Sequence, residues 1–349
     1  MSRSILHPAR VVAGVAALAL GLSACGSGAT DTPSTADTPQ VDVVASTDVW
    51  GAVAKAVGGN FVQVESIIDS PTQDPHGYEA TPQDAATVGG AQLIVMNGGG
   101  YDAFMTGLVD ASATTAPVVD AVEASGLEGA AEAAAGDPAH GAENATGDDH
   151  GHAEGDGHGH DDGHGHDDGH DHGAFNEHVW YSLPTVQRVA EDVGRHLAEI
   201  DPAHADYYAT NARTVGSGVS QLTSKATDLG RAHTGARVAV TEPVPDYLLE
   251  TAGIENVTPP QFSAAVEEGT DPPAAVVAQT LDLFRTDPPV DALVLNSQTE
   301  SASTDQVRAA AEEAGVPVVE MSETLPDGVD DYMRWMNVQL DELGAALQR

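Results

Sequence analysis

The chain has 349 residues and carries 54 Asp and Glu against 13 Lys and Arg, which gives a formal net charge of −41 at pH 7. This charge repels phosphate backbones and anionic membrane surfaces, so it excludes nucleic acid as a partner. The length is sufficient for two domains of ordinary size once the terminal and low-complexity segments are set aside.

Residues 1–24 have the pattern of a signal peptide, because two arginines precede an apolar run, Val11–Leu20, that is too short to span a bilayer. The motif Leu-Ser-Ala-Cys, which ends at Cys25, resembles the lipobox of bacterial lipoproteins. That resemblance implies lipidation of the Cys25 sulfur and anchoring to the cell membrane. Cys25 is the only cysteine in the chain, which excludes a disulfide framework. We interpret residues 25–40 as a flexible tether.

From residue 41 onward, short apolar runs alternate with longer helical patterns, which is typical of β/α units and parallel sheets. The runs fall into two groups. We therefore predict an α/β fold with an N-terminal lobe at 41–183 and a C-terminal lobe at 231–349. The predicted strands are 41–46, 62–68, 92–96 and 117–120 in the first lobe and 237–241, 291–295 and 316–320 in the second.

A His-rich segment without Lys or Arg interrupts the N-terminal lobe at 137–172. Neutral imidazole is a common ligand of Zn²⁺, and the interspersed aspartates add charge that attracts cations. Frequent glycines and few apolar residues argue against a packed core, so we predict a disordered loop that collects metal. The alternative is a solvated acidic loop that binds metal only as an affinity tag would. The candidate auxiliary ligands are His150, His152, His158, His160, His164, His166, His170 and His172.

Residues 184–230 carry apolar residues at helical spacing and are predicted to link the lobes as a long helix. Asp201-Pro202 lies inside this run, and Gly216 and Gly218 follow, so we expect a break or kink there. Two α/β lobes whose strand ends face each other create a cleft, and open α/β sheets bind ligands at such strand ends.

Four residues near predicted strand ends form a candidate metal site in this cleft. His76 lies in a loop just before a helix start that Thr81 would cap. His178 directly follows the His-rich segment, while Glu242 and Glu300 each follow a predicted strand of the second lobe. Any one of the four would more often be an ordinary capping or surface residue. Together they would give a metal two nitrogen and two carboxylate ligands.

The motifs around both histidines resemble those of the zinc/manganese solute-binding lipoproteins of ABC importers, the ZnuA/TroA-like family. They read Asp-Pro-His-Gly-Tyr-Glu-Ala-Thr-Pro-Gln-Asp at 74–84 and Asn-Glu-His-Val-Trp at 176–180. In the second motif, Asn176 and Glu177 replace the acid and the proline that are usual in the family. The similarity covers nearly the whole mature chain. It implies two (β/α) lobes with four-stranded, mainly parallel sheets joined by one long helix, with the metal in the cleft between them.

The same resemblance implies a ligand set of His76, His178, Glu242 and Glu300, of which Glu300 matches only by its spacing from a strand end. Zinc members commonly have a third histidine where Glu242 stands, so two histidines with two carboxylates resemble the manganese and iron members. The His-rich segment, in contrast, is typical of zinc members. An imidazole-rich collector also favours zinc over manganese, which is at the weak end of the affinity series. We therefore expect Zn(II), with Mn(II) as the alternative.

The function that follows from this resemblance is binding and not catalysis. The chain has neither a His-Glu-x-x-His motif nor a Gly-x-Ser-x-Gly motif, so we do not expect an enzyme. We expect an extracytoplasmic, lipid-anchored monomer that captures metal and delivers it to an ABC permease driven by an ATPase. An extracellular metal buffer or adhesin without a transport role is the other class that remains open.

Overall fold

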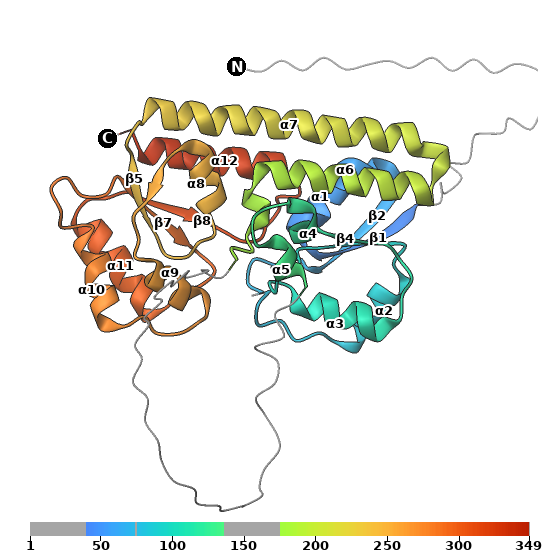
Figure 1. The fold of residues 1–349 in the computed structure, drawn as a ribbon, viewed down its shortest axis with the longest axis horizontal. Helices are drawn as coiled ribbons and strands as arrows, with labels where there is room; N and C mark the ends of the chain where they lie inside the picture. The colour runs from blue at the N-terminus through green and yellow to red at the C-terminus, as the bar shows by residue number, and fades with distance from the viewer. Residues whose placement is uncertain (1–39, 74, 136–174, 349) are drawn as a thin grey trace, which may run out of the picture. The chain divides into compact units, whose positions relative to one another are not determined.

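The computed structural model describes residues 40–73, 75–135 and 175–348 (Figure 1). The predicted signal peptide, Cys25, the tether except Gln40, and the His-rich segment with its eight candidate ligands lie outside these residues. Within the described residues, no helix combines the length and the apolar character needed to cross a membrane.

The N-terminal lobe is built on a parallel sheet with the strand order β2-β1-β3-β4. The central strands are buried along almost their whole length, which is why the sequence shows them as apolar runs. The strands are β1 (Val41–Thr47), β2 (Val62–Ile68), β3 (Leu93–Met96) and β4 (Val118–Asp120). The helices are α1 (Asp48–Gly58), η1 (Gly59–Phe61), α2 (Pro82–Gly90), α3 (Ala103–Ser112), α4 (Ala121–Ser125) and α5 (Ala130–Ala134).

The C-terminal lobe repeats this topology, with the strand order β6-β5-β7-β8 and all pairs parallel. Its first edge strand was not predicted, because β6 has only two residues and neither is buried. The strands are β5 (Arg237–Val240), β6 (Glu255–Asn256), β7 (Ala292–Asn296) and β8 (Val318–Met321). The helices are α8 (Asp246–Ala252), α9 (Pro260–Glu267), α10 (Ala274–Asp282), α11 (Ala302–Glu313) and α12 (Tyr332–Ala346).

The run between the lobes is two helices, α6 (Leu183–Ile200) and α7 (Ala205–Ala232), with a short 3-10 turn, η3 (Pro202–His204), between them. The chain breaks at Asp201, as expected, and α7 packs back along α6. Helix α7 also contacts α1 in the first lobe and α8 and α12 in the second, so it is the element that extends along both (Figure 1). Gly216 and Gly218 do not interrupt it, and Gly218 lets the side chain of Met333 in α12 pack closely.

One hydrophobic core runs through both lobes. Its buried aromatic residues include Trp50 in the first lobe, Tyr181 in the 3-10 turn η2 (Val179–Tyr181), and Trp335 in the second lobe. Buried hydrogen bonds cross the same region, since the hydroxyl of Tyr332 donates to the carbonyl of Trp180 at 2.6 Å. The shared core therefore holds the loops at the carboxyl ends of the two sheets in a defined relation to each other.

Candidate metal centre

The two predicted histidines meet at a carboxylate that the sequence did not single out. The Nε2 atoms of His76 and His178 each lie 3.3 Å from Oε1 of Glu267. One potential ligand atom from each of these three residues lies within 4.8 Å of those of the other two. Among the described residues, His76, His178 and Glu267 therefore form a group that could hold a metal ion. The histidines belong to the first lobe and its junction with α6, whereas Glu267 ends α9 in the second lobe.

The loop that carries His76 is fixed by the start of α2. Thr81 is the N-cap, as the sequence predicted for this helix start. The Thr81 hydroxyl accepts a hydrogen bond from the backbone N–H of Asp84, and the Asp84 carboxylate accepts one from the backbone N–H of Thr81. The His76 ring packs edge-on against Tyr101, with the ring centroids 4.9 Å apart. Its side chain is 29% exposed, and its Nδ1 atom lies 3.5 Å from Oε1 of Glu177. The Nε2 atom is thereby turned towards Glu267.

His178 is held more tightly, with only 1% of the residue exposed. Its ring packs against Trp180, with the centroids 5.1 Å apart, and its Nδ1 atom lies 2.8 Å from Oδ1 of Asn176. The Asn176 amide donates in turn to the carbonyl of Pro243 in the second lobe. A partner at Nδ1 orients an imidazole and leaves Nε2 for a metal, which is the usual arrangement of a ligand histidine.

Two further carboxylates of the second lobe lie beside this group. Glu242 follows β5 as predicted and is 2% exposed, while Glu323 follows β8 and is 4% exposed. The amide of Asn296, at the end of β7, donates to both, and the hydroxyl of Tyr101 donates to Glu323 at 3.1 Å. Asn296 and Tyr101 therefore hold both carboxylates in place, and the predicted residue Glu242 is one of them.

The structure does not bring Glu300 to the histidines. Its side chain is 70% exposed, and its carboxylate lies 3.8 Å from the guanidinium of Arg308. Glu300 comes directly before Ser301, the N-cap of α11, so the chain has already turned into the next helix at this position. The residue that reaches towards the site from the end of β7 is Asn296. The expectation for Glu300 rested on spacing from the strand end, and spacing alone did not capture this turn.

The site is strongly anionic, and its pKa values reflect this. Burial raises the pKa of Glu242 to about 7, with further contributions from the charges of Glu267 and Glu323. Burial lowers the pKa of His76, but Glu267, Glu177 and Glu323 outweigh it and raise that pKa to about 9. The two histidines also hold the pKa of Glu267 at about 2, against the opposing effect of burial. The carboxylates around the histidines therefore stabilise positive charge at this site.

The donor set has the chemistry and the spacing of a divalent-metal site. For a metal bound tetrahedrally at 2.0–2.1 Å, neighbouring ligand atoms lie about 3.3–3.4 Å apart. Both contacts of Glu267 with the imidazole nitrogens are 3.3 Å. Two imidazoles with carboxylates suit zinc, manganese and iron. The arrangement can therefore hold a metal ion between groups supplied by the two lobes.

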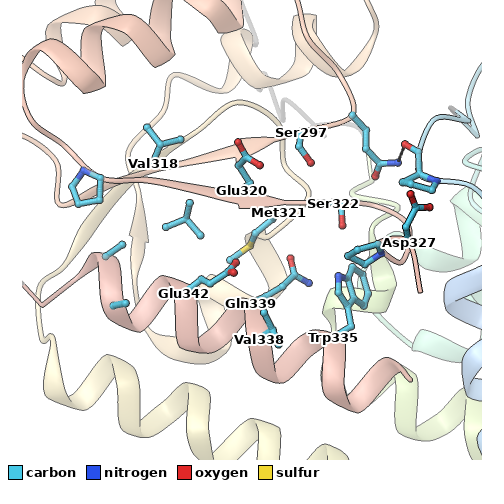
Figure 2. A pocket seen from close by; sticks show the side chains of 17 residues that line it. Ser297, Val318, Glu320, Met321, Ser322, Asp327, Trp335, Val338, Gln339 and Glu342 are labelled. Atoms are coloured by element: carbon cyan, nitrogen blue, oxygen red, sulfur yellow. Dashed lines mark hydrogen bonds between the residues drawn. The ribbon is translucent and has the colours of Figure 1, made fainter. Parts of the chain in front are cut away.

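A separate hollow of about 850 Å³ lies between β8 and α12 (Figure 2). Met321, Trp335 and Gln339 line it together with acidic residues such as Glu342. None of the histidines or carboxylates of the candidate metal centre is among its lining residues. The hollow is therefore a feature of the β8 edge of the second sheet and not a part of the metal centre.

A family model described as "Zinc-uptake complex component A periplasmic" matches residues 43–346. The chain belongs to this family. The match spans both lobes and both histidine motifs, so the family expected from the sequence is confirmed.

Similar proteins are named as transport components for different metals. The manganese ABC transporter substrate-binding lipoprotein PsaA of Streptococcus pneumoniae is 26% identical over 227 residues, or 62% of this chain and 59% of PsaA. The chain thus spans about three fifths of that relative. The iron ABC transporter substrate-binding lipoprotein MtsA of Streptococcus pyogenes serotype M1 is 22% identical over 346 residues, or 94% of each chain.

The solved structures confirm the fold of two α/β lobes. The periplasmic zinc-binding protein TroA from Treponema pallidum superposes with a TM-score of 0.64 at 16% identity, covering 89% of this chain and all of TroA (100%). Because these relatives are named for manganese, iron and zinc, family membership alone does not identify the metal that this chain binds.

Proposed function

We propose that the protein is the metal-binding component of an ABC importer, which captures Zn²⁺ between its lobes and delivers it to a membrane permease driven by an ATPase. The observation that carries this proposal is the approach of His76 and His178 to one carboxylate of the opposite lobe, at 3.3 Å from each Nε2 atom. A metal at this point would be bound by both lobes at once. Release would then require the contacts of the ion with one of the two lobes to be broken.

Binding, and not catalysis, is the activity that this donor set supports. A catalytic zinc site keeps an open position beside a general base. Here the histidines face Glu267, and the buried carboxylates Glu242 and Glu323 lie next to it. Such a surplus of protein ligands favours enclosing the ion over presenting it to a second substrate.

The proposed metal is zinc, with manganese as the alternative. Imidazole nitrogen favours zinc over manganese by its place in the affinity series, and two of the proposed ligands are histidines. Several carboxylates moderate this preference because oxygen ligands suit manganese. The His-rich segment outside the described residues adds nine further imidazoles and supports zinc.

The names of the relatives as lipoproteins support the proposed location. With Cys25 lipidated, the protein would be tethered outside the cytoplasmic membrane as a monomer, beside the permease. The net charge of −41 would draw cations towards the protein.

The decisive experiment is metal analysis of a variant that lacks residues 140–172, which isolates the proposed centre from the His-rich segment. We expect one tightly bound equivalent of zinc and a lower affinity for manganese, measured by competition with a chelator. His76→Ala and His178→Ala should each abolish the tight equivalent while the circular dichroism spectrum stays that of the folded protein. Tight binding that survives either substitution would overturn the assignment of the site.

A further inference from the structure

We infer that Glu267, at the end of α9, is a direct ligand of the bound metal. This inference rests on the proposed function and adds to it a carboxylate that neither the sequence motifs nor the family match assigned. It makes α9 a part of the metal site, although α9 lies outside both histidine motifs and is not adjacent in sequence to any predicted ligand.

The Glu267 carboxylate lacks the hydrogen bonds that usually accompany a buried charge. Both of its oxygens are buried, and within the described part of the chain neither accepts a hydrogen bond of normal geometry. A buried, ionised carboxylate without hydrogen bonds is costly unless a cation is close to it. Its nearest partners are the two imidazole Nε2 atoms. The Nε2 atom of His178 is likewise buried without a hydrogen-bond partner among the described residues.

The other two carboxylates beside the histidines differ from Glu267 in their hydrogen bonds. Glu242 and Glu323 both accept hydrogen bonds from Asn296, and Glu323 accepts another from Tyr101. Their lone pairs are thus partly used within the protein, and neither forms part of the compact group of ligand atoms. Glu267 has its lone pairs available and is aimed at the same point as the two histidines.

The geometry of the contacts between Glu267 and the two histidines also fits a bound ion. The two contacts of Glu267 are equal at 3.3 Å, which is the separation expected between neighbouring ligands of one tetrahedral ion. A carboxylate oxygen that only balanced the charge of two protonated rings would form charge-assisted hydrogen bonds of about 2.7–2.9 Å, which are shorter than the 3.3 Å contacts of Glu267. Equal contacts with two rings point instead to a shared centre.

The test compares Glu267→Gln with Glu268→Gln, since both residues stand at the end of α9 but Glu268 is exposed. The glutamine retains the size of the side chain and removes the anionic oxygen. We expect Glu267→Gln to weaken zinc binding by ~100-fold or more, beyond the 10–100-fold range usual for residues that only support a ligand. Glu268→Gln should stay within about twofold of the parent protein, as expected for an exposed surface carboxylate.

A second readout separates a ligand from a supporting charge. With Co²⁺ in place of Zn²⁺, the visible absorption bands report the ligand set, so they should shift in Glu267→Gln and remain unchanged in Glu268→Gln. An unchanged Co²⁺ spectrum with a modest loss of affinity in Glu267→Gln would overturn the inference. If His76→Ala also left zinc binding unchanged, the proposed function would fail as well, so the two failures are distinguishable.

Discussion

The side chain of Asn176 holds His178 from two directions. Its Oδ1 atom lies 2.8 Å from Nδ1 of the ring and accepts a hydrogen bond from the His178 backbone N–H at 3.1 Å. Its Nδ2 atom donates at 2.9 Å to the carbonyl of Pro243, the residue that follows Glu242. One amide thus places the proton of His178 on Nδ1, and it also ties a ligand histidine to the opposite lobe.

We predict that Asn176→Ala weakens zinc binding by about 10–100-fold, the range typical for loss of a residue that orients a ligand histidine. Asn176→Asp keeps the acceptor for Nδ1 but loses the donor to Pro243, so it should cost less affinity than the alanine variant. Chelator competition on the variant lacking residues 140–172 measures both effects. Equal losses in the two substitutions would show that the link to Pro243, and not the hydrogen bond to the ring, is what matters.

Two single substitutions, compared with each other, test which carboxylates of the second lobe contribute to zinc binding. Glu323 is 4% exposed and hydrogen-bonded beside the site, whereas the Glu300 side chain is 70% exposed and pairs only with Arg308 among the described residues. We expect Glu323→Gln to weaken zinc binding at least ~10-fold, and Glu300→Gln to change it by less than about twofold. Isothermal titration calorimetry measures both. A loss in Glu300→Gln comparable to that in Glu323→Gln would restore the original assignment of Glu300.

The fold was largely predictable because its strands are buried and short. Runs such as Leu93–Met96 and Ala292–Asn296 are apolar at every position or nearly so, and turn residues separate them from helical patterns. The two-residue strand β6 has no such pattern. The sequence predicted a break at Asp201-Pro202. It did not predict that α7 packs back along α6, because the direction of the second helix depends on tertiary packing.

The site was predictable only where a motif marks it. His76 and His178 stand in distinctive segments, and Glu242 follows a clear strand. Glu267 is the last residue of a helix and precedes Glu268 and Gly269, a pattern that any exposed helix end could have. Glu323 lies in a loop after β8 and is recognisable as a site residue only through its contacts with Tyr101 and Asn296. These roles depend on tertiary proximity between distant segments, which one sequence does not reveal.

Close helix packing predicts a stability effect away from the site. In α7, a Cβ at Gly230 would overlap the carbonyl oxygen of Ala252 at the end of α8. Gly230→Ala should therefore lower the free energy of unfolding by about 1–3 kcal/mol, the usual cost of overpacking. Gly107→Ala in α3 is the control, since its Cβ would meet nothing within 4 Å, and it should stabilise by up to ~1 kcal/mol. Urea denaturation measures both, and a Gly230 variant as stable as the control would contradict this packing.

Zinc binding at pH 7 should release protons, because the pKa of His76 is raised to about 9 and that of His178 is also raised in the metal-free protein. An imidazole must be neutral to bind metal, so the apparent zinc affinity should rise with pH from 6 towards 9 and then level off. Calorimetry in two buffers of different ionisation enthalpy counts the released protons, and the variant lacking residues 140–172 keeps the His-rich segment from contributing. Zinc binding without proton release would contradict the raised pKa of His76.

The stability of the metal-free protein should depend on pH through the same groups. The pKa of His76 is raised from 6.5 to about 9, so its contribution is fully present below pH 6.5 and is lost as the pH rises through about 9. The pKa of Glu267 is lowered from 4.5 to about 2, so its contribution is present above pH 4.5 and is lost as the pH falls towards 2. The melting temperature of the metal-free protein should therefore be highest between these limits and fall towards pH 9. His76→Ala should flatten the alkaline side of this profile, and a profile unchanged by the substitution would show that His76 does not form the charged contact with Glu267.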